Sequence, residues 1–316
     1  MNASGVLVVG SITADLTAFG SRMPSPGETI LGNDFTLVLG GKGANQAISA
    51  ARAGAATSMV GCVGDDLFQD VVLDGLRREG IETAHVAVIP GPTGVAHIRV
   101  DAAGENDIVM VPLANGHLTE ETVEAAIEQA RDGTGVLLLQ LEIPLPAAVH
   151  AARTAHRLGI TVVLDPAPAA VLDEDVWAYA DIVTPNESEA SALTGIEVTD
   201  PASARAAAGW FIERGVGRAV VTMGGQGAIS ADEHGCTEHL PYPAEAVDTT
   251  AAGDAFAGTL GAGLAAGTPW ETALQRAMAA GALAVTVPGA SPSLPRAAEI
   301  TALIEKHGQQ ETADAQ

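Results

Sequence analysis

Small residues lead into an aspartate in the segment VDTTAAGDAFAG, residues 247–258. Ala251, Ala252 and Gly253 precede Asp254, and an apolar helical pattern follows. Because the first N–H groups of a helix have no partner within it, the segment predicts an anion hole that could hold a γ-phosphate. Asp254 beside it could accept the proton of an attacking hydroxyl as the general base of a phosphoryl transfer. The alternative is an ordinary first-turn aspartate, worth about 0.3–1 kcal/mol against the helix dipole.

Lys42 lies among three glycines in LVLGGKGANQA, residues 37–47, and the chain has only one other lysine, Lys306. The segment is not a Walker A loop, because Gly43 stands where that motif needs Ser or Thr. The chain also lacks a GxGxxG motif followed by an acidic residue, which disfavours nicotinamide binding. The segment predicts either a ligand-binding loop or a plain glycine turn with a solvated lysine. Both alternatives are open, and a functional lysine is a hypothesis from composition: a compact ammonium fits against crowded backbone better than a planar guanidinium.

Two further segments combine strand ends with ligand-binding types of residue. In TPNESEA, Asn186 and Glu189 have the spacing of a helix N-cap and the carboxylate that caps in return. In the functional alternative, Asn186 could also face phosphate oxygens and Glu189 could hold a Mg²⁺-bound water. In VVTMGGQGA, residues 220–228, closely spaced glycines would allow a nucleotide to approach the backbone, or would form a simple hairpin.

Two acids follow apolar strands: Asp15 after VLVVGSITA and Glu142 after VLLLQL. We expect both at the carboxyl edge of a parallel sheet, where open α/β folds bind ligands. There they could accept hydrogen bonds from sugar hydroxyls, although either could equally cap a loop.

The composition limits the class of protein. The chain has 316 residues, 47% of them hydrophobic but only 3% aromatic, which suits small side chains packed between helices and a sheet. A formal charge of −24 disfavours binding to nucleic acid or to anionic membrane surfaces. The two cysteines, Cys62 and Cys236, are expected to be reduced thiols in a cytoplasmic protein, and the N-terminus lacks the pattern of a secretory signal.

The elements that must position these residues follow from the hydrophobic pattern. Strands are predicted at 6–10, 136–141, 160–165, 181–185 and 218–223, and helices at 43–54, 67–80, 121–132, 146–159, 187–195 and 201–215, with further helices after Gly253, Thr268 and Pro295. Apolar strands that alternate with amphipathic helices predict an α/β fold with a mostly parallel sheet covered on both faces.

Two stretches have a different pattern. Residues 28–40 and 85–112 contain short strands with turns and predict a small separate sheet that acts as a lid. Ala96 and Ile98 alternate with His97 and Arg99, so one face of this sheet could cover a ligand while the other meets solvent or a partner. Residues 309–316 are expected to form a polar tail after a single domain of residues 1–308.

GGKGAN and DTTAAGDAFAG, in this order, resemble the two signatures of the PfkB family of carbohydrate kinases, and the resemblance extends over roughly nine-tenths of the chain. It implies a ribokinase-like three-layer fold with a central sheet flanked by helices and a β-sheet lid that often joins two subunits in a homodimer. It also implies ATP-dependent phosphorylation of a sugar with Mg²⁺ and a monovalent cation, usually K⁺.

The resemblance assigns a role to each matching position. Asp254 would be the general base, with Ala251, Ala252 and Gly253 lining the anion hole. The positions implied to contact the sugar are Thr13, Asp15, Gly41, Lys42, Asn45, Glu142 and Asp254. Those implied to contact the nucleotide are Asn186, Thr222, Gly224, Gly227 and Gly253, with Met278 near the adenine. Those implied at metal ions are Glu189 for Mg²⁺ and Asp248, Thr250, Ala284, Val287, Gly289 and Ser293 for K⁺.

One position departs from the family pattern. Thr13 stands in GSITAD where ribose-phosphorylating members have an asparagine, so a single hydroxyl replaces an amide with donor and acceptor groups. The expected reaction is D-ribose and ATP to D-ribose 5-phosphate and ADP. The alternatives are a kinase for 2-deoxyribose, fructose or a nucleoside, or a regulator that binds sugar or nucleotide without turnover.

Overall fold

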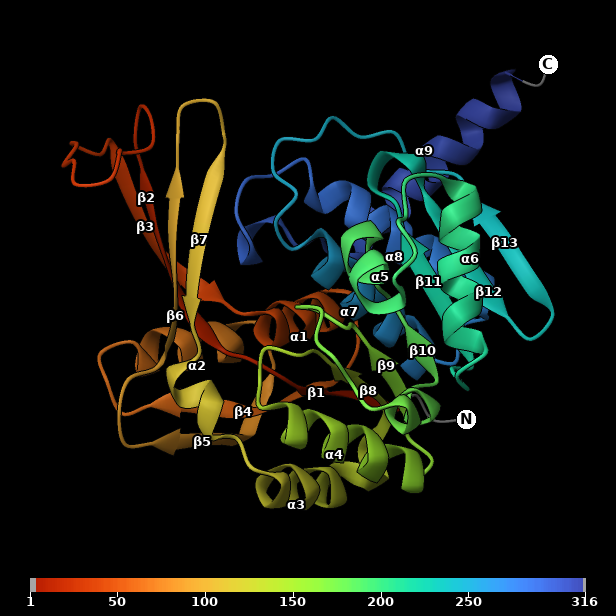
Figure 1. Ribbon diagram of the computed structural model, residues 1–316, viewed down its shortest axis with the longest axis horizontal. Helices are drawn as coiled ribbons and strands as arrows, with labels where there is room; N and C mark the ends of the chain where they lie inside the picture. Colours follow the sequence, from red (N-terminus) through yellow and green to blue (C-terminus); the bar gives the residue numbers. More distant parts are fainter. Residues whose placement is uncertain (1–3, 315–316) are drawn as a thin grey trace.

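A computed structural model describes residues 4–314, which contain two β-sheets of unequal size (Figure 1). The large sheet has nine strands in the order β13-β12-β11-β10-β9-β8-β1-β4-β5. Its strands are β1 (Gly5–Val9), β4 (Thr57–Gly64), β5 (Glu82–Ile89), β8 (Thr134–Leu139), β9 (Thr161–Leu164), β10 (Ile182–Val183), β11 (Arg218–Thr222), β12 (Ala228–Asp232) and β13 (Gly235–His239). All neighbours from β5 to β11 are parallel, and β12 and β13 add an antiparallel edge. The predicted α/β fold with a mostly parallel sheet is confirmed.

Helices cover both faces of this sheet. One face carries α1 (Lys42–Arg52), α2 (Gln69–Arg78), α7 (Ala252–Ala265), α8 (Trp270–Ala284) and α9 (Ala297–Asp314), and the other carries α3 (Glu120–Ala130), α4 (Leu145–Arg157), α5 (Glu187–Thr194) and α6 (Pro201–Ile212). In β1, Val6 and Val8 pack toward the first group, whereas Leu7 and Val9 pack toward the second. This alternation explains why the central strands are apolar without interruption.

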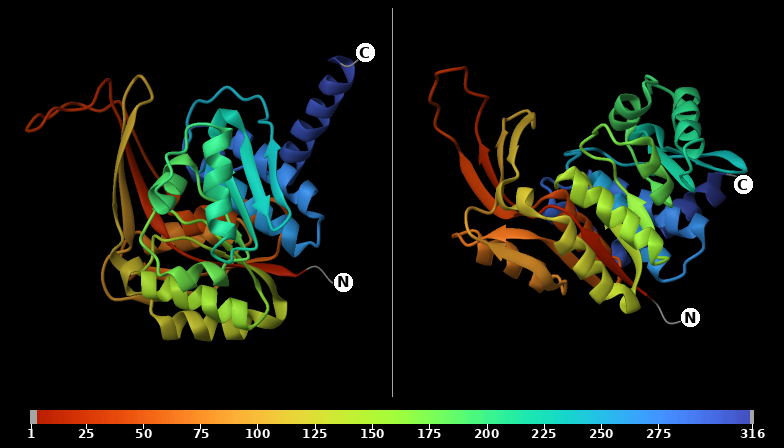
Figure 2. Two further views of the ribbon diagram at one scale, coloured as in Figure 1. Left: turned by 45° about the vertical axis from the view of Figure 1, so that its right-hand side comes forward. Right: turned by 60° about the horizontal axis from the view of Figure 1, so that its bottom comes forward.

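The small sheet projects from one side of the molecule, at the left in Figure 1, and both views in Figure 2 show it clear of the helical layers. Its strands are β3 (Asp34–Gly40), β2 (Thr13–Phe19), β6 (Gly94–Val100) and β7 (Asn106–Val111), in that order. The cross-strand register places Ala96 beside Asp15, so the two side chains share a face. The predicted separate sheet is confirmed, and Ala96 lies on the face that carries Asp15.

Three boundaries differ from the predictions. Residues 85–89 belong to β5 at the edge of the large sheet, because they pair with β4 from Val60 to Gly64. The chain after β1 enters the small sheet as β2, which the sequence pattern did not separate from the first strand. The predicted polar tail is helical as far as Asp314, because Gln, Glu and Ala all favour a helix. Residues 315–316 lie outside the described range. None of the described helices is long and apolar enough to cross a membrane.

Candidate active site

The carboxyl ends of the central parallel strands bring the candidate residues together. Glu142 follows β8, Asp165 follows β9, and Asn186 follows β10. The N-termini of α1 and α7 approach the same edge, and these two helices pack closely against each other. Segments far apart in sequence thus form one site, as expected for an open α/β sheet.

Asp254 lies in the first turn of α7 and is only 4% exposed. The side chain of Asn45 donates to its Oδ2 (3.0 Å) and that of Gln46 donates to its Oδ1 (3.1 Å). Burial raises the pKa of Asp254 to about 6, although the Lys42 charge and these two hydrogen bonds act in the opposite direction. A carboxylate with this pKa is ionised at neutral pH and is a better proton acceptor than an exposed aspartate.

The start of α7 has the shape of an anion hole. Ala251 takes a left-handed conformation (φ 61°) as the N-cap, which turns the chain into the helix. Within residues 4–314, no hydrogen bond engages the N–H groups of Gly253 or Asp254, whereas that of Ala252 donates to the Thr249 carbonyl (3.3 Å). Two N–H donors at the positive end of a helix are thus available to an anion.

Lys42 lies at the first position of α1, beside this helix end. Its backbone N–H donates to Glu142 Oε2 (3.0 Å), and its Nζ lies 3.5 Å from Asp165 Oδ2. Burial alone would lower the pKa of the ammonium, but the surrounding carboxylates, with Asp165 and Asp254 foremost, raise it above its ordinary value. Lys42 therefore stays charged, and the plain solvated lysine considered above is excluded.

The glycines around Lys42 allow this close packing. A Cβ at Gly43 would lie 2.6 Å from the carbonyl carbon of Gly10 and the nitrogen of Ser11, closer than nonbonded atoms approach. Gly41 has φ 90°, which L-residues with a side chain rarely adopt. Both positions therefore require glycine.

Asp15 reaches the site from the small sheet. It is part of β2, so the prediction that it emerges from the large parallel sheet was wrong: the chain leaves β1 and changes sheet before Asp15. The Thr13 hydroxyl donates to its Oδ1 (2.7 Å), and burial raises the pKa of Asp15 to about 6. Thr13 thus orients this acid, a role that its sequence position did not reveal.

A cavity of about 240 Å³ lies against the N-terminus of α7, where Ala252 and Gly253 line it. The residues predicted at the nucleotide that line it are Thr222, Gly224, Gly227, Gly253 and Met278. Tyr242, Phe256 and Val285 add apolar walls. Because the cavity reaches the N-terminus of α7, a nucleotide bound there would direct its phosphates toward Asp254.

Asn186 and Glu189 form a capping box at the start of α5. Asn186 Oδ1 accepts from the Glu189 N–H (2.9 Å), and Glu189 Oε2 accepts from the Asn186 N–H (2.9 Å). This accounts for their spacing. A carboxylate has a second oxygen, so the geometry still suits a Mg²⁺-bound water at Glu189.

Two loops near α7 contain the positions predicted for a monovalent cation. Asp248 accepts hydrogen bonds from the backbone N–H of Thr250 (2.9 Å) and of Gly289 (2.8 Å), which joins the loops. The other predicted positions are Ala284, the last residue of α8, and Val287 and Ser293, which follow it. The atoms at these positions that could bind a cation are oxygens, which suit a hard cation such as K⁺. Across residues 4–314, no group of three or more His, Cys, Asp or Glu side chains forms a metal site.

Three further residues of the site, Gln46, Gln140 and Asp165, were not predicted from the sequence. Gln46 is fully buried, donates to both Asp254 and Asp165, and accepts from Gln140 (2.5 Å). Asp165 follows a buried strand as Glu142 does, so the same local pattern could have identified it. Nothing in the sequence distinguished the two glutamines from ordinary polar residues.

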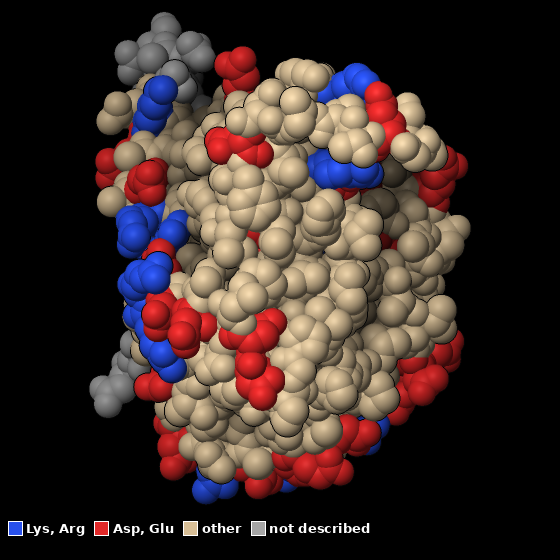
Figure 3. Space-filling view, turned by 90° about the vertical axis from the view of Figure 1, so that its left-hand side faces the viewer, with Lys and Arg blue, Asp and Glu red and all other residues tan. Residues whose placement is uncertain are grey.

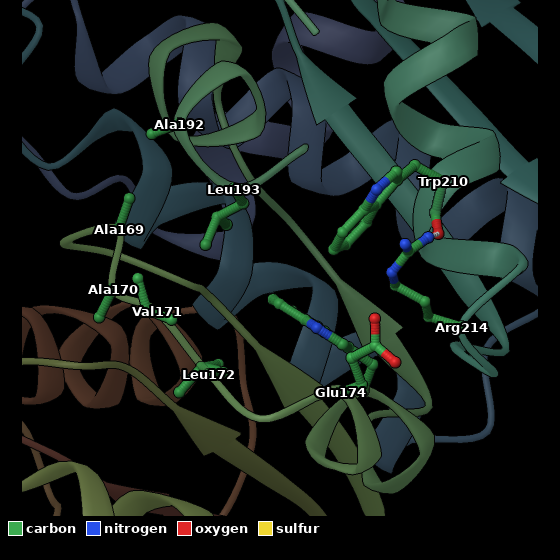
Figure 4. A pocket seen from close by; sticks show the side chains of 10 residues that line it. Ala169, Ala170, Val171, Leu172, Glu174, Ala192, Leu193, Trp210 and Arg214 are labelled. Atoms are coloured by element: carbon green, nitrogen blue, oxygen red, sulfur yellow. Dashed lines mark hydrogen bonds between the residues drawn. The ribbon is translucent and has the colours of Figure 1, made fainter. Parts of the chain in front are cut away.

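A separate cavity of about 280 Å³ lies between α5, α6 and the loop before Trp177 (Figure 4). Trp210 flanks it, with the Arg214 guanidinium 3.6 Å from the centre of its ring. Arg214 also donates to the Trp210 carbonyl (3.2 Å). Packing accounts for these side chains, and none of the predicted site residues lines this cavity.

The side of the molecule that bears the small sheet has a broad face with few charges (Figure 3). The small sheet leaves large apolar side chains exposed, and the register places three of them, Phe35, Val109 and Val111, on the face opposite Asp15. An apolar area of this kind on a projecting sheet is typical of an interaction surface.

A family profile matches this chain, and known proteins of several organisms are similar to it. The profile of the pfkB family carbohydrate kinases matches residues 3–297. A ribokinase of Haemophilus influenzae is 38% identical over 302 residues, which cover 94% of this chain and 97% of that protein. A deoxyribokinase of Salmonella typhimurium is 36% identical over 295 residues, 92% of this chain and 95% of that protein. The structure of Arabidopsis thaliana ribokinase complexed with ribose and ATP has a TM-score of 0.84 at 30% identity, covering 95% of this chain and 98% of that one.

Proposed function

The chain belongs to the pfkB family of carbohydrate kinases, and we propose that it transfers the γ-phosphoryl group of ATP to the 5-hydroxyl of D-ribose. The observation that carries this proposal is the position of Asp254. Its carboxylate is buried against Asn45 and Gln46 in the first turn of α7, the start of this helix lines an apolar cavity, and within residues 4–314 no hydrogen bond engages the N–H groups of Gly253 and Asp254.

In the proposed transfer, the sugar hydroxyl donates to Asp254. Its oxygen attacks the γ-phosphorus as Asp254 takes the proton, and the bond from phosphorus to the β,γ-bridging oxygen breaks, which releases ADP. The N–H groups of Gly253 and Asp254 donate to the phosphoryl oxygens, where negative charge must be stabilised. Lys42 stays charged next to Asp254 and adds to that stabilisation.

The sugar is proposed to bind between the small sheet and the large one. Asp15 and Glu142 accept from its hydroxyls, and Lys42 donates to it. Asn45 supports this assignment, because its Oδ1 is buried without a partner within the described residues and suits a sugar hydroxyl.

Two ions complete the proposed site. Mg²⁺ would accompany ATP, with Glu189 holding one of its water ligands, and would neutralise phosphate charge. K⁺ would lie against Thr250, Gly289 and neighbouring carbonyls and would order the start of α7. A chain of charge −24 repels MgATP at long range, so we expect strong dependence on Mg²⁺ and on ionic strength.

A kinase for 2-deoxyribose is the second candidate. The single hydroxyl of Thr13 already donates its hydrogen to Asp15. Thr13 therefore offers the sugar fewer hydrogen-bonding groups than an amide would. The similarity to a deoxyribokinase supports the same alternative.

We further propose a cytoplasmic homodimer joined through the small sheet. Phe35 and Val109, 56% and 62% exposed, belong to the apolar area that would be covered. Sedimentation of a variant that carries both Phe35→Glu and Val109→Glu, compared with the parent, tests the proposed dimer. We expect the variant to be monomeric, and an unchanged dimer would contradict the proposal.

The first test of function is ADP release with MgATP and K⁺ on ribose, 2-deoxyribose, fructose and adenosine. Comparison of kcat/KM identifies the preferred substrate, and phosphorus NMR of the product identifies the phosphorylated hydroxyl. Turnover of none of the four would contradict the proposal.

A further inference from the structure

A buried amide lies directly behind the proposed base. Gln46 is 0% exposed, and its Nε2 donates to Asp254 Oδ1 (3.1 Å) and to Asp165 Oδ2 (2.8 Å). Its Oε1 accepts from Gln140 Nε2 (2.5 Å). One side chain of α1 thus connects the ends of β8 and β9 to the first turn of α7.

These contacts leave Gln46 a single orientation. An amide NH₂ has two hydrogens, and each serves one carboxylate. Rotation of the amide by 180° would place its oxygen against both carboxylates and its nitrogen against the Gln140 donor. The network therefore fixes which way the Asp254 carboxylate faces.

Asp165 belongs to the same network but has no part in the transfer described above. It is buried and lies 3.5 Å from Lys42 Nζ. In the sheet order, its strand β9 lies between β8, which leads to Glu142 on the sugar side, and β10, which leads to Asn186 on the nucleotide side. Its charge thus holds the ammonium at the boundary between the two substrates.

We propose that Gln46 and Asp165 are positioning residues for the transfer step: Gln46 orients the Asp254 carboxylate toward the sugar, and Asp165 holds the Lys42 ammonium beside it. This inference rests on the proposed kinase function. The proposal gives both residues an effect on the protonation of the Asp254 carboxylate. A residue that only filled space in the core would have no such effect.

Few charged groups lie around Asp254. Lys42 comes from α1, Asp165 follows β9, and Asp15 comes from the small sheet. The strands β1 and β8, which also pack against α7, contain no ionisable residue, and in α8 the residues near the start of α7, such as Gly281, are small and uncharged. Substitutions in the network should therefore act on Asp254 in directions that can be assigned.

Two nearly isosteric variants should act in opposite directions. Asp165→Asn removes a like charge and frees Lys42, which favours the ionised base, so the acid limb of kcat/KM against pH should move down by about one unit. Gln46→Met removes a hydrogen bond to the ionised form, so the limb should move up by about one unit. Exposed residues offer matched controls, Asp70→Asn and Gln275→Met, which should leave the limb in place.

The protonation of Asp254 should also be followed directly, by NMR titration of ¹³C-carboxyl aspartate with the resonance assigned from Asp254→Asn. This measurement needs no turnover, so a parent protein inactive on all sugars would contradict the kinase function and still leave the network testable. If Gln46→Met does not fold, Gln140→Leu can replace it. This variant removes the hydrogen bond that holds the Gln46 amide, so it should also raise the midpoint of the Asp254 titration. Opposite shifts support the proposal, whereas unchanged midpoints, or shifts in the same direction, would overturn it.

Discussion

Replacing Asp254 with asparagine should stabilise the protein while it greatly slows catalysis. The pKa of Asp254 rises from 3.8 to about 6 on folding, mainly through burial. Because the folded-state pKa is the higher one, the unfolded chain ionises first as pH rises, and the free energy of unfolding falls between about pH 4 and pH 6. A shift of about two units corresponds to about 3 kcal/mol at pH 8 and about half of that at pH 5.

The Asp254→Asn variant would lack this penalty but would also lose part of the acceptor capacity that Asn45 and Gln46 use. One lost hydrogen bond costs about 1–2 kcal/mol, so the net gain at pH 8 is about 1–2 kcal/mol. At pH 5 the gain should vanish. Urea unfolding of both proteins at the two pH values measures the difference, and the change between pH 5 and pH 8 is independent of the hydrogen-bond term.

The same variant tests the role of Asp254 as base. An amide cannot take up the proton, so kcat should fall by about 10²–10⁴. In the parent, kcat/KM should decline tenfold per unit below about pH 6. A variant that turns over like the parent, or that gains nothing in stability from pH 5 to pH 8, would refute the reasoning about this buried carboxylate.

Four other substitutions, one of them a control, have defined outcomes. Thr13→Asn should raise the ratio of kcat/KM for ribose over 2-deoxyribose several-fold, because the amide adds a donor and an acceptor; an unchanged ratio would remove Thr13 from sugar selection. Gly43→Ala should destabilise the protein by about 1–3 kcal/mol in urea unfolding, because its Cβ meets backbone, whereas Gly209→Ala, in open space on α6, should stabilise by about 0.5–1 kcal/mol. Trp177→Ala should cost about 3–5 kcal/mol in the same assay, because Trp177 is 2% exposed and packs edge-on against two aromatic rings, with kcat unchanged at low temperature.

The parts of the site that could be predicted are those whose local sequence carries their geometry. Three such local patterns are a glycine before a helix start, an N-cap pair such as Asn186 and Glu189, and an acid after an apolar strand. The alternating pattern also identified the layers of the large sheet, because burial on both faces requires uninterrupted apolar strands.

What could not be predicted depends on contacts between distant segments. Gln46 and Gln140 are separated by 94 residues and meet only because α1 packs across the ends of β8 and β9. The change of sheet between β1 and β2 leaves no mark in the periodicity, so Asp15 was placed at the wrong edge. Its pairing with Thr13 follows from their two-residue spacing on one face of β2, which becomes visible only when β2 is known to be a strand.

The network also explains why a chain with thirteen arginines keeps a lysine at this point. The Lys42 side chain is partly buried, its backbone N–H donates to Glu142, and its ammonium lies beside Asp165 at the proposed boundary between sugar and nucleotide. A guanidinium would form a paired contact with Asp165 and extend into the space that a phosphoryl group must cross. A single ammonium can donate to Asp165 and still direct another hydrogen toward that space, so the carboxylate that holds Lys42 leaves it free to act.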